Sequence, residues 1–124
     1  QSRLLSFSFE GSAGFAKMKA LIASLRASAP GAIGGFAVEE IADYQSSVQK
    51  TAGGAETPIY LPKSNVLRFF LAGGNEAVVR PSGTEPKLKV YLTATAETKE
   101  LSLQALDRME REMNPIVALD RGNA

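Results

Sequence analysis

The 124-residue sequence contains no cysteine and no histidine, and its net charge is only +1. Without cysteine, disulfides and thiolate metal sites are excluded, and a reducing compartment is allowed but not proved. Without histidine, the chain lacks the commonest general base and the commonest metal ligand. The near-neutral charge gives no basic excess for wholesale binding of nucleic acid or acidic membranes.

Long apolar runs are also missing, because no segment approaches the roughly 20 residues of a membrane span, and no signal peptide is visible. The hydrophobic content of 44% and charged content of 22% are typical of a globular domain. We expect residues 1–119 to form one domain with its own core, followed by a polar tail at residues 120–124. The start at Gln1, without methionine, favours a segment of a longer polypeptide.

Helical spacing occurs twice. The first apolar stripe comprises Phe15, Met18, Leu21, Ile22 and Leu25, with Ser12 as a plausible cap and Pro30-Gly31 as the stop. The second helix is predicted to begin at Glu97, with a stripe of Leu103, Leu106, Met109 and Met113 that Ile116 or Val117 could extend. Pro115 should end or kink it.

Strand-like segments surround these helices, at residues 3–9, 36–41, 66–71, 76–79 and 88–92, with a weaker edge strand at residues 56–61. Residues 44–55 are polar and predicted to be the least ordered stretch. The order strand, helix, about four strands, helix predicts an α+β two-layer sandwich, a mainly antiparallel sheet with helices on one face. Glu39 and Glu40 are adjacent strand residues, so their carboxylates are expected to diverge and form no acid–base pair.

The stretch that carries the most chemical information is Val79-Arg80-Pro81-Ser82-Gly83-Thr84-Glu85-Pro86-Lys87, followed by Leu88-Lys89. Proline and glycine at their positions predict a tight turn at residues 80–83, and turns of this kind present backbone N–H groups that bind anions. A guanidinium (Arg80), two hydroxyls (Ser82, Thr84) and two ammonium groups (Lys87, Lys89) surround it. These groups suit a phosphate. The alternative is an ordinary hairpin loop with solvated charges.

The residues from Arg80 to Lys87 resemble the phosphate-binding loop in the C-terminal domain of the α-D-phosphohexomutases, which include phosphoglucomutase and phosphomannomutase. Residues 6–11 (SFSFEG) and 62–67 (PKSNVL) are similar to segments of the same domain in the phosphoglucomutase branch. The similarity extends from about Leu5 to Leu92. It implies a fold like that of the TATA-box-binding protein, with the order β-α-β(4)-α.

The resemblance also implies a function, that of a cytoplasmic intramolecular phosphotransferase which interconverts hexose 1-phosphate and 6-phosphate through a phosphoserine and a bisphosphorylated sugar. Such enzymes have four domains, use Mg²⁺ and depend on glucose 1,6-bisphosphate as activator and intermediate. The fourth domain clamps the non-reacting phosphate. On this basis Arg80 would hold the phosphate and Ser82, the Gly83 backbone and Thr84 would complete the cradle. Lys89 and Lys87 are further candidates, and Glu85 is expected to orient Arg80 or Lys87 or to face another domain.

The expected partners are therefore a phosphosugar and the other three domains of the same polypeptide, with no nucleic acid and no membrane. The sequence shows no phosphoserine loop and no cluster of aspartates for magnesium, so the chain alone is expected to be inactive. A standalone anion-binding or protein-interaction module remains the alternative. A nucleic-acid-binding module is suggested only by the fold analogy, and the charge disfavours it.

Overall fold

The structure, a computed structural model, describes residues 1–9, 11–82 and 85–120, without the side chains of residues 115–120. The elements, in chain order, are β1 (Ser2–Ser8), α1 (Gly11–Ala27), β2 (Ala32–Ile33), β3 (Phe36–Asp43), β4 (Val48–Thr51), β5 (Glu56–Pro58), β6 (Leu67–Leu71), the 3-10 turn η1 (Ala72–Gly74), β7 (Asn75–Pro81), β8 (Lys87–Thr93) and α2 (Lys99–Asp120). The predicted α+β class is confirmed.

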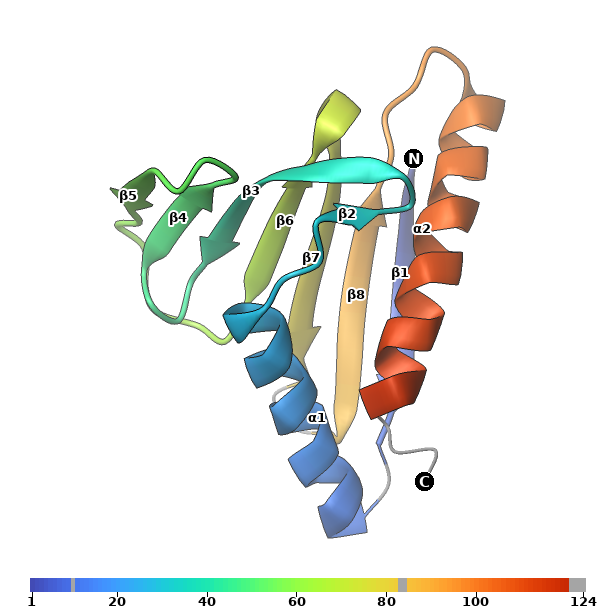
Figure 1. The fold of residues 1–124 in the computed structure, drawn as a ribbon. Helices are drawn as coiled ribbons and strands as arrows, with labels where there is room; N and C mark the ends of the chain where they lie inside the picture. The colour runs from blue at the N-terminus through green and yellow to red at the C-terminus, as the bar shows by residue number, and fades with distance from the viewer. Residues whose placement is uncertain (10, 83–84, 121–124) are drawn as a thin grey trace.

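The strands form one antiparallel sheet in the order β1-β8-β7-β6-β3-β4-β5, and β2 pairs separately with the start of β3. Every strand pairing in the described chain is antiparallel. Both helices lie in front of the same face of the sheet, and the strands β4 and β5 extend to one side (Figure 1). The structure is therefore a two-layer arrangement with one sheet face left free of helices.

The core lies between the helices and this face of the sheet. Each central strand buries alternate residues, as the pleat of a strand requires. The buried side chains include Leu88, Val90 and Leu92 of β8, Ala77 and Val79 of β7, Leu67, Phe69 and Leu71 of β6, Met18, Leu21, Ile22 and Leu25 of α1, and Leu106, Met109 and Met113 of α2. Arg3 of β1 also points to this side, where its Nη1 atom contacts Asp107 Oδ1 at 2.8 Å and Glu110 Oε1 at 2.9 Å.

The face that α1 buries differs from the predicted stripe at its first turn. Phe15 is 41% exposed, whereas Gly14 is buried, because the helix approaches the backbone of Phe9 too closely for a side chain. A Cβ atom at Gly14 would lie 2.7 Å from the carbonyl carbon of Phe9. The helix also begins at Gly11, so Ser12 lies inside it and is not the residue before it.

α2 differs from its prediction at both ends and at one stripe position. It begins at Lys99, two residues after the predicted start, and Thr98 caps it, since Thr98 Oγ1 accepts a hydrogen bond of 3.1 Å from the Leu101 N–H. It continues through Pro115 to Asp120; a proline removes one helical hydrogen bond but need not end the helix. Leu103 is exposed, and the predicted extension to Ile116 or Val117 lies outside the described side chains.

The polar stretch from residue 44 to residue 55 contains a strand, β4, which the sequence analysis did not predict. Asp43 starts the turn before it: its Oδ1 atom accepts hydrogen bonds of 3.0 Å from the Gln45 N–H and 3.4 Å from the Ser46 N–H. Such local bonds favour turns. β5 is short, contains Pro58 and lies at the sheet edge, as predicted.

Candidate phosphate-binding site

The β7–β8 hairpin holds the residues that the sequence singled out. β7 ends at Pro81 and β8 begins at Lys87, and the Ser82 N–H donates a 2.8 Å hydrogen bond to the Lys87 carbonyl. The tight turn was predicted to begin at Arg80, and this is wrong, because Arg80 and Pro81 still pair with β8 as strand residues. Pro81 is tolerated there since β6 reaches only as far as Val79, so no second strand needs its missing N–H.

Strand register places two cations beside each other on the helix-free face. Arg80 of β7 lies opposite Lys89 of β8, and directly paired residues of an antiparallel ladder point to the same face. The core residues Leu88 and Val90 point the other way. Lys87 precedes Lys89 by two positions, so it shares this face at the end of the strand next to the loop. The predicted residues Arg80, Lys87 and Lys89 are thus brought together.

The pairing of charges distinguishes these three cations. Among the residues that the structure describes, Arg80 and Lys89 have no ion pair and no side-chain hydrogen bond. Lys87 is different, because its Nζ atom lies 3.3 Å from Glu85 Oε2. Among the described residues, the hairpin therefore presents two positive charges without an ionic partner, and a third that is partly neutralised by a neighbouring carboxylate.

The rest of the predicted cradle is described only in part. Gly83 and Thr84 lie outside the described residues. Ser82 is half-buried, and its N–H group already donates to the Lys87 carbonyl, so this backbone donor is used within the hairpin. Within the described ranges, the Ser82 hydroxyl has no hydrogen-bond partner. It remains a candidate donor beside Arg80.

Two serines in β1 border the cations, and the sequence analysis did not single them out. Ser6 lies opposite Lys89, and Ser8 lies opposite Lys87. Both are exposed, and both alternate with residues that face the core. Their polar alternation was visible in the sequence, but the pairing of β1 with β8 was not. Ser6, Lys89 and Arg80 consequently form a continuous row across three strands, which we call the cationic row.

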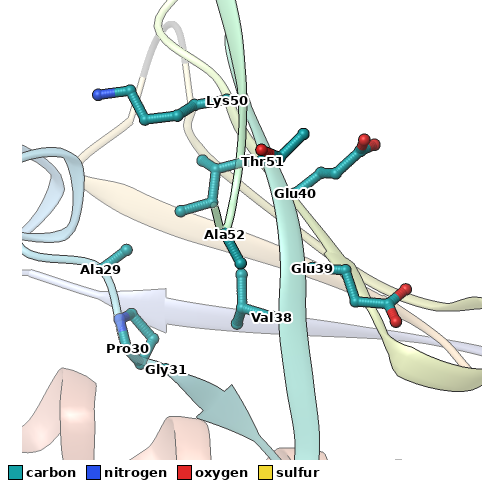
Figure 2. Close-up of a pocket in the computed structure, with 10 residues that line it drawn as sticks. Ala29, Pro30, Gly31, Val38, Glu39, Glu40, Lys50, Thr51 and Ala52 are labelled. Atoms are coloured by element: carbon teal, nitrogen blue, oxygen red, sulfur yellow. The ribbon is translucent and has the colours of Figure 1, made fainter. Parts of the chain in front are cut away.

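Several hollows of the described structure lie away from this hairpin. One, of about 240 Å³, lies between the α1–β2 connection and strands β3 and β4, beside Pro30, Val38 and Lys50 (Figure 2). Glu39 and Glu40 border it but extend to the same side of β3, away from the hollow (Figure 2). The expectation that they diverge is wrong, because a β-bulge between Val38 and Glu40 interrupts the alternation.

A second hollow, of about 300 Å³, is lined in part by a paired arginine and aspartate. Arg26 Nε lies 2.9 Å from Asp43 Oδ2, and the Arg26 Nη2 atom donates a 2.8 Å hydrogen bond to Asn65 Oδ1. Burial by itself raises the pKa of Asp43, but hydrogen bonds from Arg26, Gln45 and Ser46 outweigh it and hold that pKa below its ordinary value. This ion pair joins α1 to the sheet, whereas Lys50, which also lines the hollow, forms no ion pair among the described residues.

The described residues show neither a metal-binding cluster nor a helix that could cross a membrane. They contain no cluster of three or more histidine, cysteine, aspartate or glutamate side chains, so they do not fit a magnesium site. Neither helix of the described chain combines the length and apolar character that crossing a membrane requires.

Comparison with known proteins identifies a family over a range that includes this hairpin. The family described as "Phosphoglucomutase/phosphomannomutase, C-terminal domain" matches residues 34–111, which include β7, β8 and the loop between them. Proteins named phosphoglucomutase are similar to the chain: that of Staphylococcus saprophyticus is 37% identical over 98 residues, and that of Staphylococcus haemolyticus is 39% identical over 93 residues.

These matches cover most of the chain but a small part of each relative. They span 78% of this chain and 18% of the Staphylococcus saprophyticus protein, and 74% and 17% for Staphylococcus haemolyticus. The phosphoglucomutase of Staphylococcus epidermidis is 32% identical over 106 residues, which cover 85% of this chain and 19% of that protein. The chain thus spans less than a fifth of the length of the curated relatives that it matches. The chain belongs to the phosphoglucomutase/phosphomannomutase family and corresponds to its C-terminal domain.

Proposed function

We propose that this chain is the substrate-phosphate-binding domain of a phosphohexomutase, an enzyme that interconverts hexose 1-phosphate and hexose 6-phosphate through a bisphosphorylated intermediate. The observation that carries the proposal is the cationic row, in which Arg80 and Lys89 lie opposite each other without ionic partners in the described chain. The family membership supports it. Family relatives named phosphoglucomutase contain much more polypeptide, so the activity of a longer protein is itself part of the proposal.

The charge at this site matches a phosphate monoester. Its dianion carries about two negative charges at neutral pH, and Arg80 and Lys89 supply two positive charges on one face. The planar guanidinium of Arg80 can form two parallel hydrogen bonds to phosphate oxygens, while Lys89 acts as a point charge. Ser82 and Ser6 would add hydroxyl donors from the two flanking positions. Gly83 and Thr84 belong to the proposed cradle through the resemblance of the loop.

A clamp on the spectator phosphate suits phosphoryl transfer. The enzyme mainly positions groups and compensates charge in such reactions, so binding energy gained at the remote phosphate orients the reacting end. A bisphosphate intermediate must also turn around between the two half-reactions. A clamp that recognises phosphate and ignores the rest of the sugar accepts either end.

In this proposal the magnesium ion and the phosphoserine belong to other parts of a longer polypeptide; the described residues contain no cluster of three or more histidine, cysteine, aspartate or glutamate side chains. Glucose 1,6-bisphosphate would meet this chain only through one phosphate. We therefore expect the isolated chain to bind phosphate weakly and to lack mutase activity. We also propose that the domain rotates as a unit to open and close the cleft of the enzyme, which identical domain angles with and without ligand would contradict.

The test is an amide chemical-shift titration of the chain with glucose 1-phosphate, glucose 6-phosphate and inorganic phosphate. We expect all three to shift the resonances of Arg80, Ser82 and Lys89 at similar millimolar concentrations. Arg80→Ala should weaken binding about tenfold or more, since a hydrogen bond to a charged group contributes about 1.5–3 kcal/mol.

Lys99→Ala provides the control, because Lys99 starts α2 at the end of the sheet away from the hairpin (Figure 1). It removes one positive charge, as Arg80→Ala does, and should leave phosphate binding unchanged. Equal weakening by both variants would show that only net charge matters. Absence of shifts in the hairpin with any of the three ligands would refute the proposed function.

A further inference from the structure

Within the described part of the proposed site, Glu85–Lys87 is the one pair in which a carboxylate touches a cation. Glu85 Oε2 lies 3.3 Å from Lys87 Nζ, and the two side chains are 55% and 39% exposed. No ionic partner of Arg80 or Lys89 lies in the described ranges. The three cations of the hairpin are therefore not equivalent before a ligand binds.

Backbone hydrogen bonds hold Lys87 in the hairpin. The Lys87 N–H donates a 2.7 Å hydrogen bond to the Glu85 carbonyl, and the Lys87 carbonyl accepts the bond from Ser82. Lys87 also pairs with Ser8 of β1. A lysine side chain has a flexible four-carbon stem, so an ammonium held by Glu85 can reach different positions from the same backbone.

Because Lys87 lies next to the cationic row, its pairing with Glu85 changes the charge that the site offers to a phosphate. Lys87 shares the helix-free face with Lys89, two residues further along β8, and this face carries Arg80 as well. If all three cations were free, the site would offer three positive charges to a phosphate dianion. With Lys87 paired to Glu85, the charge offered is close to two.

We infer that Glu85 is a positioning residue that holds Lys87 away from the phosphate and thereby limits the affinity of the clamp. This inference rests on the proposed function and names a regulation of the same site. A limited affinity suits the proposed reaction, because a bisphosphate that must turn around has to leave the clamp in every cycle. Glu85 does not touch the ligand; it acts through Lys87.

The test is a double-mutant cycle on the whole chain, read by amide-shift titration with inorganic phosphate. Glu85→Gln should tighten phosphate binding about two- to fivefold, the range expected for release of an exposed ion pair. In the Lys87→Met background the same Glu85→Gln change should give no tightening. The control Glu56→Gln removes an equal charge from the exposed edge strand β5 and should leave the affinity unchanged.

The cycle separates the action through Lys87 from simple repulsion. If Glu85→Gln tightens binding equally with Lys87 and with Met at position 87, Glu85 repels the anion directly and the inference is wrong. No tightening in either background also refutes it. The Lys87 Nζ resonance gives a second readout, because it should shift in Glu85→Gln without any phosphate. Failure of the wild-type chain to bind phosphate would instead refute the proposed function itself.

Discussion

Gly34, in the turn between β2 and β3, allows one structural contact to be tested in isolation. Its φ is +64°, and a Cβ atom there would lie 2.7 Å from Met109 Cγ, 2.9 Å from Met109 N and 3.0 Å from Met109 Cα. Two of these atoms are backbone atoms of α2, so a change of rotamer cannot relieve the clash. The turn is also tied to the helix, since the Arg108 Nε atom donates a 3.3 Å hydrogen bond to the Gly34 carbonyl and the Gly34 N–H donates to Glu112.

The expected cost of Gly34→Ala has two parts. A side chain at positive φ costs about 1–2 kcal/mol, and overpacking against a fixed neighbour costs about 1–3 kcal/mol. We therefore expect a loss of about 2–5 kcal/mol in the free energy of unfolding, the sum of these two contributions. Gly35→Ala is the matched control, because Gly35 has φ +84° but nothing within 4 Å of the added Cβ, so only the first part applies. Gly31→Ala has neither and should be close to neutral.

The measurement is urea unfolding followed by circular dichroism, with linear extrapolation to water. Gly34→Ala should be less stable than Gly35→Ala by about 1–3 kcal/mol, the overpacking part alone. Equal losses in the two variants would refute the reasoning, because they would show that the approach of the turn to Met109 does not determine the choice of glycine at position 34.

Two further predictions concern polar contacts of the fold. The ion pair with Arg26 lowers the pKa of Asp43, so it should stabilise the fold at pH values above 3.8, the ordinary pKa of an aspartate, and lose this contribution as the pH falls through the lower folded pKa. The urea midpoint of Arg26→Met should therefore fall less between pH 6 and pH 2 than that of the wild type. Midpoints that fall in parallel would contradict this. Asn75 is buried; its Nδ2 donates to the Ala72 carbonyl at 2.8 Å and its Oδ1 accepts from the Thr95 N–H at 2.9 Å. Asn75→Ala should therefore lower the free energy of unfolding by about 1–3 kcal/mol in the same urea assay. An unchanged midpoint would show that water replaces both bonds.

The sequence alone predicted burial correctly where the pattern depends only on neighbouring residues along the chain. The alternation in β8 predicted that Leu88 and Val90 are buried and that Lys89 faces away from the core, and the structure confirms both. It was insufficient where two distant segments meet. Gly14 is buried because α1 lies close to the backbone of Phe9. The spacing of hydrophobic residues favoured Phe15 instead, because such a pattern cannot show where a helix needs a residue without a side chain.

The candidate site shows the same division. The motif named Arg80, Lys87 and Lys89, and a short hairpin brings them to one face. Ser6 was missed because its position opposite Lys89 depends on pairing between strands from opposite ends of the chain. The bulge at Glu39 was missed because the sequence of β3 alone does not show that its pairing register with β6 shifts between Val38 and Glu40.

The pairing of β1 with β8 also has a consequence for the order of events during synthesis. The register runs from Ser2 opposite Thr93 to Ser8 opposite Lys87, so β1 is completed by the strand β8, which is made about 80 residues later. A ribosome adds about 5–20 residues per second, which leaves β1 without its neighbour for roughly 5–20 s. In that interval the backbone groups of β1 have no partner strand from β8. Because Ser6 can meet Lys89 only after β8 has been made, the cationic row is completed late in the synthesis of this domain.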